Sequence, residues 1–237
     1  MNGRSRTSRS GRIQAQLSGI RVRTRRVGVF CVAVPETITF DVFFDYTCPF
    51  VYRAAGLLDA VQRSGRRNIE VRWRYFSLTQ VNSKNDGWTV WNAPGSEHVR
   101  GRLAFQAAEA ARRQGLFAGL HGRLLLARHR DQLDLDDREV VEKIAADAAV
   151  DVGRFRSDVD DPAILESLAR DHRQGVLEHG VFGTPTFVFA DGASAYVRLS
   201  ERVNESGAVE VFDRLMAVAA AEPRILEIKR PRRPSQP

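Results

Sequence analysis

Hydrophobic residues occur in short runs and helical spacings that predict a strand, a helix and a second strand near the start of the folded region. The stretch from Thr37 to Asp45 is rich in β-branched and aromatic residues, which is typical of a buried strand. A helix is expected from about Pro49 to Arg63, because proline suits the first helical position, where its missing N–H would have no partner. The predicted apolar stripe of this helix consists of Tyr52, Ala55, Leu58 and either Val61 or Leu57.

A second strand follows, in which apolar residues alternate with charged ones. In IEVRWRY the apolar side chains stand at residues 69, 71, 73 and 75 and the charged ones stand between them, so one face should pack on the core. Strand, helix and strand over about 40 residues form a βαβ unit with a right-handed crossover.

The next region is expected to be a loop followed by a helical insertion. SLTQVNSKNDGWTVWNAPG, residues 77–95, has the composition of a loop, and from residue 96 to about residue 180 the apolar spacing is helical almost throughout. One helix should hold the apolar residues of 103–117, and another those of 140–148. The breaks are expected near Gly119, Asp131 and Pro162.

Strand character returns near the end of the chain. TFVFA, residues 186–190, precedes the turn signal Asp191-Gly192 and an extended stretch at 194–199, which together predict a hairpin. A closing helix is expected over residues 208–221. The full pattern is βαβ, an inserted block of helices, and then ββα, which predicts the α/β class with a large α-helical insertion.

The two ends of the chain differ in composition from the body. The first residues are rich in Arg, Ser, Gly and Thr, which predicts a disordered basic extension, and the last are basic and Pro-rich, which predicts a flexible tail. The predicted parts are the extension (1–34), the βαβ part (35–80), the loop and helical insertion (81–180), the ββα part (181–221) and the tail (222–237).

The charge distribution argues against a specific nucleic-acid surface on the body. The chain has 237 residues and a net charge of +7, but the first 34 residues contribute +8 and the residues from Glu222 onward contribute +3. The middle of the chain therefore has a net charge of −4. We expect no specific nucleic-acid binding, although the tails could hold polyanions weakly and without sequence preference.

Cysteine usage indicates a reducing compartment. Only Cys31 and Cys48 are present, so a disulfide framework of the secreted type is not available, and no repeated Cys/His spacing predicts a metal site. We expect a cytoplasmic protein without a membrane span. The alternative is an export signal, because the apolar run VGVFCVAV follows Arg25-Arg26, although it lacks a clean cleavage site.

The candidate nucleophile is Cys48, in DYTCPFVY, where the first strand gives way to a helix. A cysteine at a helix N-terminus faces free N–H groups and the positive end of the helix dipole, and both favour the thiolate. The active-site motif is then Cys48-Pro49-Phe50-Val51-Tyr52. The alternative is a buried, inert cysteine under the sheet.

A second motif, VFGTPTFVFADG, stands just before the predicted hairpin. Proline at the start of a strand can donate no ladder hydrogen bond, and a cis Thr184–Pro185 bond would turn the chain there. With CPFV at a strand-to-helix junction, with GTPT before a hairpin and with helices between them, the chain resembles the DsbA-like branch of the thioredoxin superfamily, and actinobacterial members in particular. The resemblance covers about residues 38–221. It implies a thioredoxin-like fold, thiol chemistry at Cys48, and a partner-binding loop at Gly183, Thr184 and Pro185.

The family's second redox cysteine would stand at Val51. Without it, no internal thiol can resolve a mixed disulfide, unless the extension folds back and brings Cys31 to the site. We therefore expect a monothiol oxidoreductase with no tightly bound cofactor. Its cosubstrate would be an external low-molecular-weight thiol of the mycothiol or glutathione type, and its substrate a small or protein disulfide.

Two alternatives stay open, namely a thiol-conjugate transferase or isomerase of the same superfamily and a non-catalytic thioredoxin-fold binding protein. The substrate and the electron donor are not determined, and a homodimer is one oligomeric state that the sequence allows.

The remaining candidate residues have ordinary structural interpretations beside the functional ones. Five aromatic residues could line an apolar pocket or simply pack in the core: Phe50, Tyr52, Phe76, Trp88 and Trp91. The five histidines are expected at the surface: His98, His121, His129, His172 and His179. Asp45 and Tyr46 flank the thiol and could tune it, although a nearby carboxylate would oppose thiolate formation.

Overall fold

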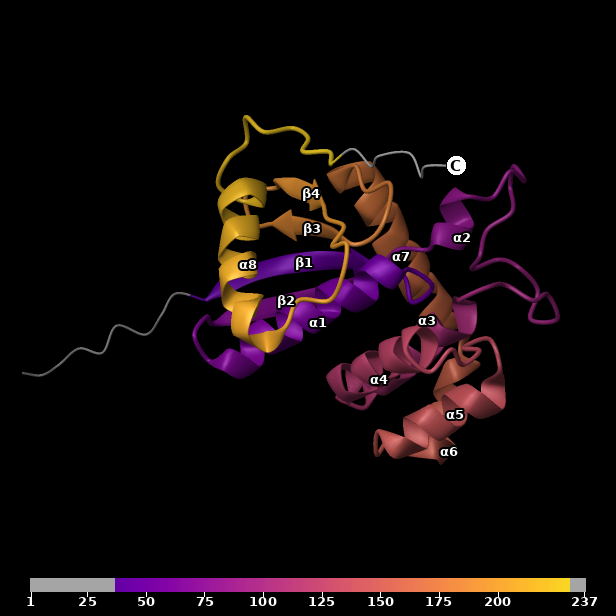
Figure 1. Ribbon diagram of the computed structural model, residues 1–237. Coiled ribbons are helices and arrows are strands. Elements are labelled where there is room, and N and C mark those ends of the chain that lie inside the picture. Colours follow the sequence, from indigo (N-terminus) through magenta and orange to yellow (C-terminus); the bar gives the residue numbers. More distant parts are fainter. Residues whose placement is uncertain (1–36, 231–237) are drawn as a thin grey trace, which may run out of the picture. The chain divides into compact units, whose positions relative to one another are not determined.

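The computed structural model describes residues 37–230, and the predictions for residues 1–34, for Cys31 and for the end of the tail lie outside this range. Figure 1 shows a sheet with helices on both faces and a group of further helices beyond one of its ends. The elements around the sheet are β1 (Ile38–Phe44), α1 (Pro49–Ser64), β2 (Ile69–Tyr75), α7 (Pro162–His179), β3 (Thr186–Phe189), β4 (Ser194–Tyr196) and α8 (Glu205–Ala219). The others are α2 (Leu78–Val81), α3 (Arg102–Arg113), α4 (Phe117–His129), α5 (Arg138–Asp147) and α6 (Val152–Val159).

The sheet has the strand order β2-β1-β3-β4. β1 pairs in parallel with β2, with Ile38 opposite Ile69, as the predicted βαβ unit requires. β3 runs antiparallel to both β1 and β4. The α/β class with a helical insertion is therefore confirmed, and β1 and β3 are the two central strands.

One face of the sheet is covered by α1 and α8. Phe40 of β1 stacks on Phe187 with ring centroids 5.6 Å apart and lies 6.2 Å from Phe212 of α8. The buried side of α1 is Val51, Ala54, Leu57, Leu58, Ala60 and Val61. The predicted stripe was thus wrong by one position at its start, because Tyr52 and Ala55 are only half-buried.

The opposite face of the sheet is covered by α7, which approaches β1 very closely. A Cβ atom on Gly175 would lie 2.7 Å from Cε1 of Phe43, so only glycine lets the helix come this near. Phe43, Phe76, Val181 and Val188 form the small core beneath this contact. The position of α7 matters for the site because its C-terminal end leads directly into the loop before β3.

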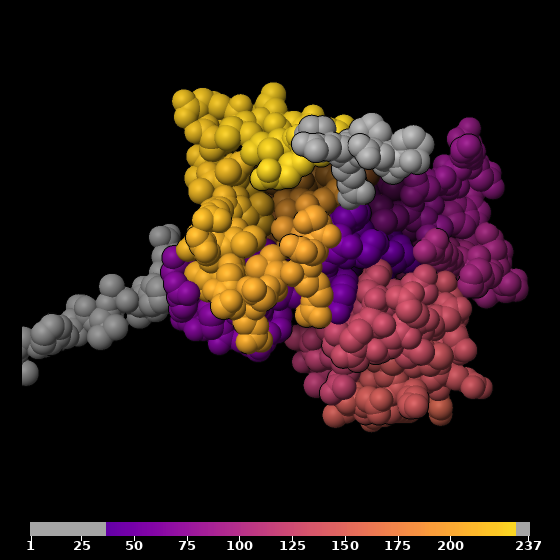
Figure 2. Space-filling view, in the orientation of Figure 1, coloured from indigo at the N-terminus to yellow at the C-terminus, as the bar shows by residue number. Residues whose placement is uncertain are grey.

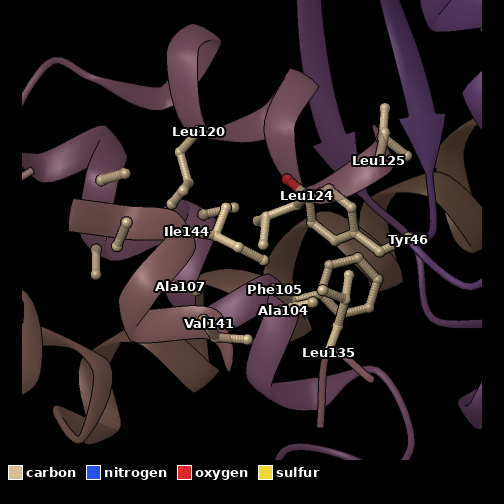
Figure 3. Close-up of a cluster of buried hydrophobic side chains, with 14 of the residues drawn as sticks. Tyr46, Ala104, Phe105, Ala107, Leu120, Leu124, Leu125, Leu135, Val141 and Ile144 are labelled. Carbon is tan, nitrogen blue, oxygen red and sulfur yellow. The ribbon is translucent and has the colours of Figure 1, made fainter. Parts of the chain in front are cut away.

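The helical insertion has a core of its own that continues into the sheet. Five alanines of α3 are fully buried and let neighbouring helices approach: Ala104, Ala107, Ala108, Ala110 and Ala111. Figure 3 shows Tyr46 and Phe105 packed together beside leucines of α4 and Ile144 of α5. The same cluster includes Phe44 and Cys48, so the thiol lies at the boundary between the sheet and the insertion.

Three helix boundaries differ from the prediction. α3 ends at Arg113 because Gly115 takes a positive φ of 74°, so residues 116 and 117 belong to the start of α4 and Gly119 lies inside that helix. The loop 77–95 contains the short helix α2, whose start is capped by the hydroxyl of Ser77. The breaks near Asp131 and Pro162 are confirmed, and Pro162 is the first residue of α7.

Candidate active site

Cys48 is the residue immediately before α1. Its backbone is extended, with φ −89° and ψ 117°, and its N–H donates to the carbonyl of Asp45 at 3.1 Å, which closes a tight turn after β1. Pro49 opens the helix, and Val51 N–H donates to the Cys48 carbonyl at 3.2 Å. The first turn of α1 contains no acidic residue, so no carboxylate of this turn offsets the positive end of the helix dipole.

The second predicted segment lies directly against this thiol. Cys48 Sγ donates a hydrogen bond to the carbonyl oxygen of Thr184 at 3.2 Å, and the Thr184–Pro185 peptide bond is cis. The loop is held by Thr186, whose hydroxyl donates to the Gly183 carbonyl at 2.8 Å. The hydroxyl of Thr184 is buried and has no hydrogen-bond partner among residues 37–230.

The other residues of the active-site motif divide between core and surface. Val51 is fully buried in the core shared with the insertion, whereas Pro49 is exposed and Phe50 and Tyr52 are half-buried. Cys48 itself is 5% exposed and is the only cysteine of the described part of the chain. A single buried thiol therefore meets the Thr184 carbonyl on one side and the helix N-terminus on the other.

Asp45 holds the turn before Cys48 and does not contact the thiol. Its carboxylate accepts hydrogen bonds from the N–H and the hydroxyl of Thr47, at 2.7 and 2.8 Å, and from Leu78 N–H at 2.7 Å. Burial raises the pKa of Asp45, and these donors act in the opposite direction. Asp45 thus ties the active-site turn to the start of α2.

Tyr46 points into the insertion and pairs with His121 of α4. The hydroxyl of Tyr46 lies 2.9 Å from Nδ1 of His121, and the imidazole stacks on Phe117 with centroids 5.0 Å apart. Burial lowers the pKa of His121 to about 3, so the ring is neutral and shares one hydrogen bond with the tyrosine hydroxyl. The surface position expected for His121 is wrong, because the aromatic cluster of the insertion encloses the ring.

His172 is the second histidine whose predicted surface position is wrong. Its Nδ1 accepts a hydrogen bond from Ser77 N–H at 3.1 Å, and Asp171 accepts from Tyr75 N–H, also at 3.1 Å. β2 lies at the edge of the sheet, so these donors at its end obtain partners from side chains of α7. Burial lowers the pKa of His172 to about 4 and keeps it a neutral acceptor.

The other three histidines are not enclosed in this way. His98 is exposed, and His129 and His179 are half-buried.

The five aromatic residues proposed for one pocket lie in separate places. Phe76 is fully buried beneath α7, and Trp88 and Trp91 pack on a small cluster of the loop around Val90. Trp91 and His172 line a cavity of about 10 Å³, which can hold at most one water molecule. These three residues therefore have packing roles in the core and the loop. Phe50 and Tyr52 instead pack against the cluster that contains Cys48.

Around Phe50 and Tyr52 the structure gathers cationic side chains that sequence reasoning missed. Arg53 is adjacent in the sequence, but Arg198 and Arg202 come from the segment between β4 and α8. In the space-filling view, the orange atoms of this late segment lie directly against the indigo atoms of the first helix (Figure 2). Nothing in the local sequence could have identified them, since 150 residues separate Tyr52 from Arg202.

Two classes of feature were not found in residues 37–230. No group of three or more His, Cys, Asp or Glu side chains there is placed to hold a metal ion. No helix in that range is long and apolar enough to cross a membrane.

Comparisons with known proteins relate this arrangement to one family. Residues 39–213 match the description "DSBA-like thioredoxin domain". The chain is 24% identical over 200 residues to the uncharacterized protein Rv2286c of Mycobacterium tuberculosis, covering 83% of this chain and 84% of that one. It also matches the Na(+)/H(+) antiporter NhaA of Herminiimonas arsenicoxydans at 36% identity over 95 residues, which is 40% of this chain but only 14% of the antiporter.

Two solved structures share the fold. The probable DsbA oxidoreductase SCO1869 of Streptomyces coelicolor superposes with a TM-score of 0.56 at 19% identity, covering 81% of this chain and 94% of that one. The cytosolic disulfide reductase DsbM of Pseudomonas aeruginosa, solved with GSH, superposes with a TM-score of 0.53 at 18% identity, covering 75% and 100%. At these identities the likeness concerns the fold.

Proposed function

The chain belongs to the DSBA-like thioredoxin domain family, and from this premise we propose that it is a monothiol oxidoreductase that acts through Cys48 with an external low-molecular-weight thiol. The observation that carries the proposal is the contact between Cys48 Sγ and the loop before Pro185. A sulfur at a helix N-terminus, beside a loop whose Thr184 hydroxyl has no hydrogen-bond partner among residues 37–230, is suited to receive a disulfide. Gly183, Thr184 and Pro185 would hold the partner's backbone or thiol.

The reaction has two thiol–disulfide exchanges. The Cys48 thiolate attacks the low-molecular-weight sulfur of a mixed disulfide, a new S–S bond forms at Cys48, and the substrate leaves as a thiolate that takes up a proton. A second molecule of the low-molecular-weight thiol, deprotonated, then attacks the Cys48 adduct. It releases Cys48 as the thiolate and leaves the symmetric disulfide, so the net reaction converts one mixed disulfide and one small thiol into the substrate thiol and the symmetric disulfide.

The absence of a thiol at the fourth motif position favours this route over a dithiol cycle. Val51 occupies the position from which a resolving cysteine would attack, and it is fully buried. Release of the adduct therefore depends on an external thiol. We propose a glutathione or mycothiol type of cosubstrate and a cytoplasmic location, for which the cytosolic neighbour solved with GSH gives support by analogy only.

A non-catalytic thioredoxin-fold binding protein is the second candidate. It is favoured by one observation, the low exposure of Cys48, because a thiol that is 5% exposed must become accessible before it can react. The thiol-conjugate transferase or isomerase remains a variant of the enzymatic proposal, since it would use the same sulfur and the same loop.

The experiment that separates these functions measures the reactivity of the thiol. In a Cys31→Ser background, Cys48 should be alkylated at pH 6 at least about tenfold faster than a free-cysteine peptide, because only the thiolate reacts and a free thiol is then under about 1% ionised. Oxidised glutathione should next give a mixed disulfide that persists until reduced thiol is added. A Cys31→Ser/Cys48→Ser chain is the control that accounts for background labelling. Reactivity no greater than that of the peptide would replace the enzyme with the binding protein.

A further inference from the structure

We propose that three arginines beside the active-site helix select low-molecular-weight thiols that carry carboxylate groups. These residues, Arg53, Arg198 and Arg202, are called the arginine rim. The inference rests on the proposed function, because it concerns the small thiol that exchanges with Cys48. It adds a binding site for the non-reacting part of that thiol, and with it the chemical class that the site accepts.

The first part of the arginine rim lies on the ring of Phe50, two residues after the nucleophile. The guanidinium carbon of Arg198 is 3.9 Å from the ring centroid of Phe50, and that of Arg53 is 5.2 Å from the same centroid. Arg53 is fixed further by a hydrogen bond from Nη1 to the Leu199 carbonyl at 2.9 Å. Two positive charges therefore share one aromatic ring at the start of α1.

The second part lies two residues further along α1, on Tyr52. The guanidinium of Arg202 is 5.0 Å from the ring centroid, and its Nη1 donates to the Tyr52 hydroxyl at 2.9 Å. The group lies close over Gly56, since a Cβ there would be in ordinary van der Waals contact with Nε and Nη2 of Arg202, at 3.5 Å. The guanidinium is thus laid along the surface of the helix instead of extending into solvent.

The charge of the arginine rim is not neutralised by the described part of the protein. Many other arginines of residues 37–230 pair with a carboxylate, but no ion pair within 4.0 Å involves Arg53, Arg198 or Arg202. Arg198 and Arg202 are exposed. His129 stacks on the Tyr52 ring, with centroids 5.5 Å apart, and burial lowers its pKa, so it adds no charge at neutral pH.

Unpaired guanidinium groups held in place are suited to carboxylates. Their planar N–H donors match the two oxygens of a carboxylate, and the aromatic rings beneath them fix the cations without using up those donors completely. Three like charges on one short stretch of surface also repel one another, which an anionic ligand would relieve. A thiol of the glutathione type carries free carboxylates, and the two aromatic rings under the arginine rim, Phe50 and Tyr52, lie within four residues of Cys48 in the chain.

The test uses three small symmetric disulfides that differ in charge: dithiodipropionate (anionic), bis(hydroxyethyl) disulfide (neutral) and cystamine (cationic). The rate of mixed-disulfide formation at Cys48 is followed by mass spectrometry in the Cys31→Ser chain. Each rate is divided by that of a free-cysteine peptide, which removes the differences in leaving-group chemistry. We expect the anionic probe to exceed the neutral one by about fivefold and the cationic probe to be slowest. Raising the salt to about 1 M should reduce the spread.

The variant Arg198→Gln/Arg202→Gln should bring the anionic and neutral probes to about equal relative rates. The matched control is Arg66→Gln/Arg170→Gln, which removes the same charge from exposed arginines that form no ion pair and lie away from α1's first turns. Equal relative rates in the unsubstituted chain would overturn the selectivity while leaving the proposed function intact. Failure of all three probes to modify Cys48 would overturn both.

Discussion

The thiol of Cys48 donates a hydrogen bond to the carbonyl oxygen of Thr184 at 3.2 Å, although 136 residues separate them in the chain. The contact joins the β1–α1 junction to the loop that begins the second half of the sheet. It also sets two influences against each other, because the helix N-terminus favours negative charge on sulfur whereas the carbonyl oxygen accepts the thiol hydrogen. A partner that takes the place of this carbonyl contact would free the sulfur for reaction.

Placing a thiol at the fourth motif position should change the chemistry of the site. Val51→Cys puts a second sulfur in the first turn of α1, where Val51 N–H already bonds to the Cys48 carbonyl at 3.2 Å. We expect mild oxidation to give an internal disulfide in place of the persistent mixed disulfide, seen as loss of two alkylatable thiols. Val51→Ser is the control for loss of apolar volume. Two thiols that stay alkylatable after oxidation would contradict the expected geometry.

The close approach of α7 to β1 should make Gly175 sensitive to the smallest side chain. Gly175→Ala places a Cβ 2.7 Å from the ring of Phe43, so the free energy of unfolding should fall by about 1–3 kcal/mol. Gly122→Ala in α4 is the matched control, because nothing lies within 4 Å of its Cβ, and it should stabilise by about 0.5–1 kcal/mol. Urea denaturation of both variants measures the difference. Equal effects of the two substitutions would show that α7 can move away without cost.

His172 should make the protein less stable in mild acid. Its pKa is about 4 in the fold and about 6.5 when unfolded, so the unfolded state binds the extra proton first as the pH falls. The contribution of this group is complete above pH 6.5 and should be lost progressively toward pH 4, by about 2 kcal/mol between pH 7 and pH 4.5. His172→Asn keeps an acceptor for Ser77 N–H and removes the titration.

Unfolding of both chains by urea at several pH values measures this effect. The neighbouring Asp171, whose pKa is raised by burial, acts in the opposite direction but is present in both chains and cancels in the comparison. The expected result is a shallower loss of stability in His172→Asn than in the unsubstituted chain. Parallel pH profiles would mean that His172 is protonated equally in both states.

The carboxylate of Asp45 should support the active-site turn without being required for the chemistry. Asp45→Asn replaces an acceptor by an NH₂ group, which would face either Thr47 or Leu78 N–H and leave that donor unpaired. We expect a loss of about 1–3 kcal/mol in unfolding free energy. The alkylation rate of Cys48 in the folded variant should change by less than about threefold. A much larger change would assign Asp45 a direct part in tuning the thiol.

The strands, the first helix and the hairpin could be predicted from local sequence patterns. Alternating and β-branched residues identified β1 and β2, Pro49 marked the start of α1, and the turn signal at residues 191–192 identified the hairpin. These features follow from backbone and side-chain preferences within a few residues, so no distant contact was needed to predict them. The family resemblance rested on the same short motifs.

Which distant side chains meet depends on how the helices and strands pack together. Whether a histidine lies at the surface depends on the elements that cover it, and α7 and the aromatic rings of the insertion enclose His172 and His121. The arginine rim combines Arg53 with residues that come after β4, and no local pattern links them. Long-range packing brings these side chains together because the sheet places β3 beside β1 and β4 beside β3. A short segment of sequence does not show which distant segment will lie next to it.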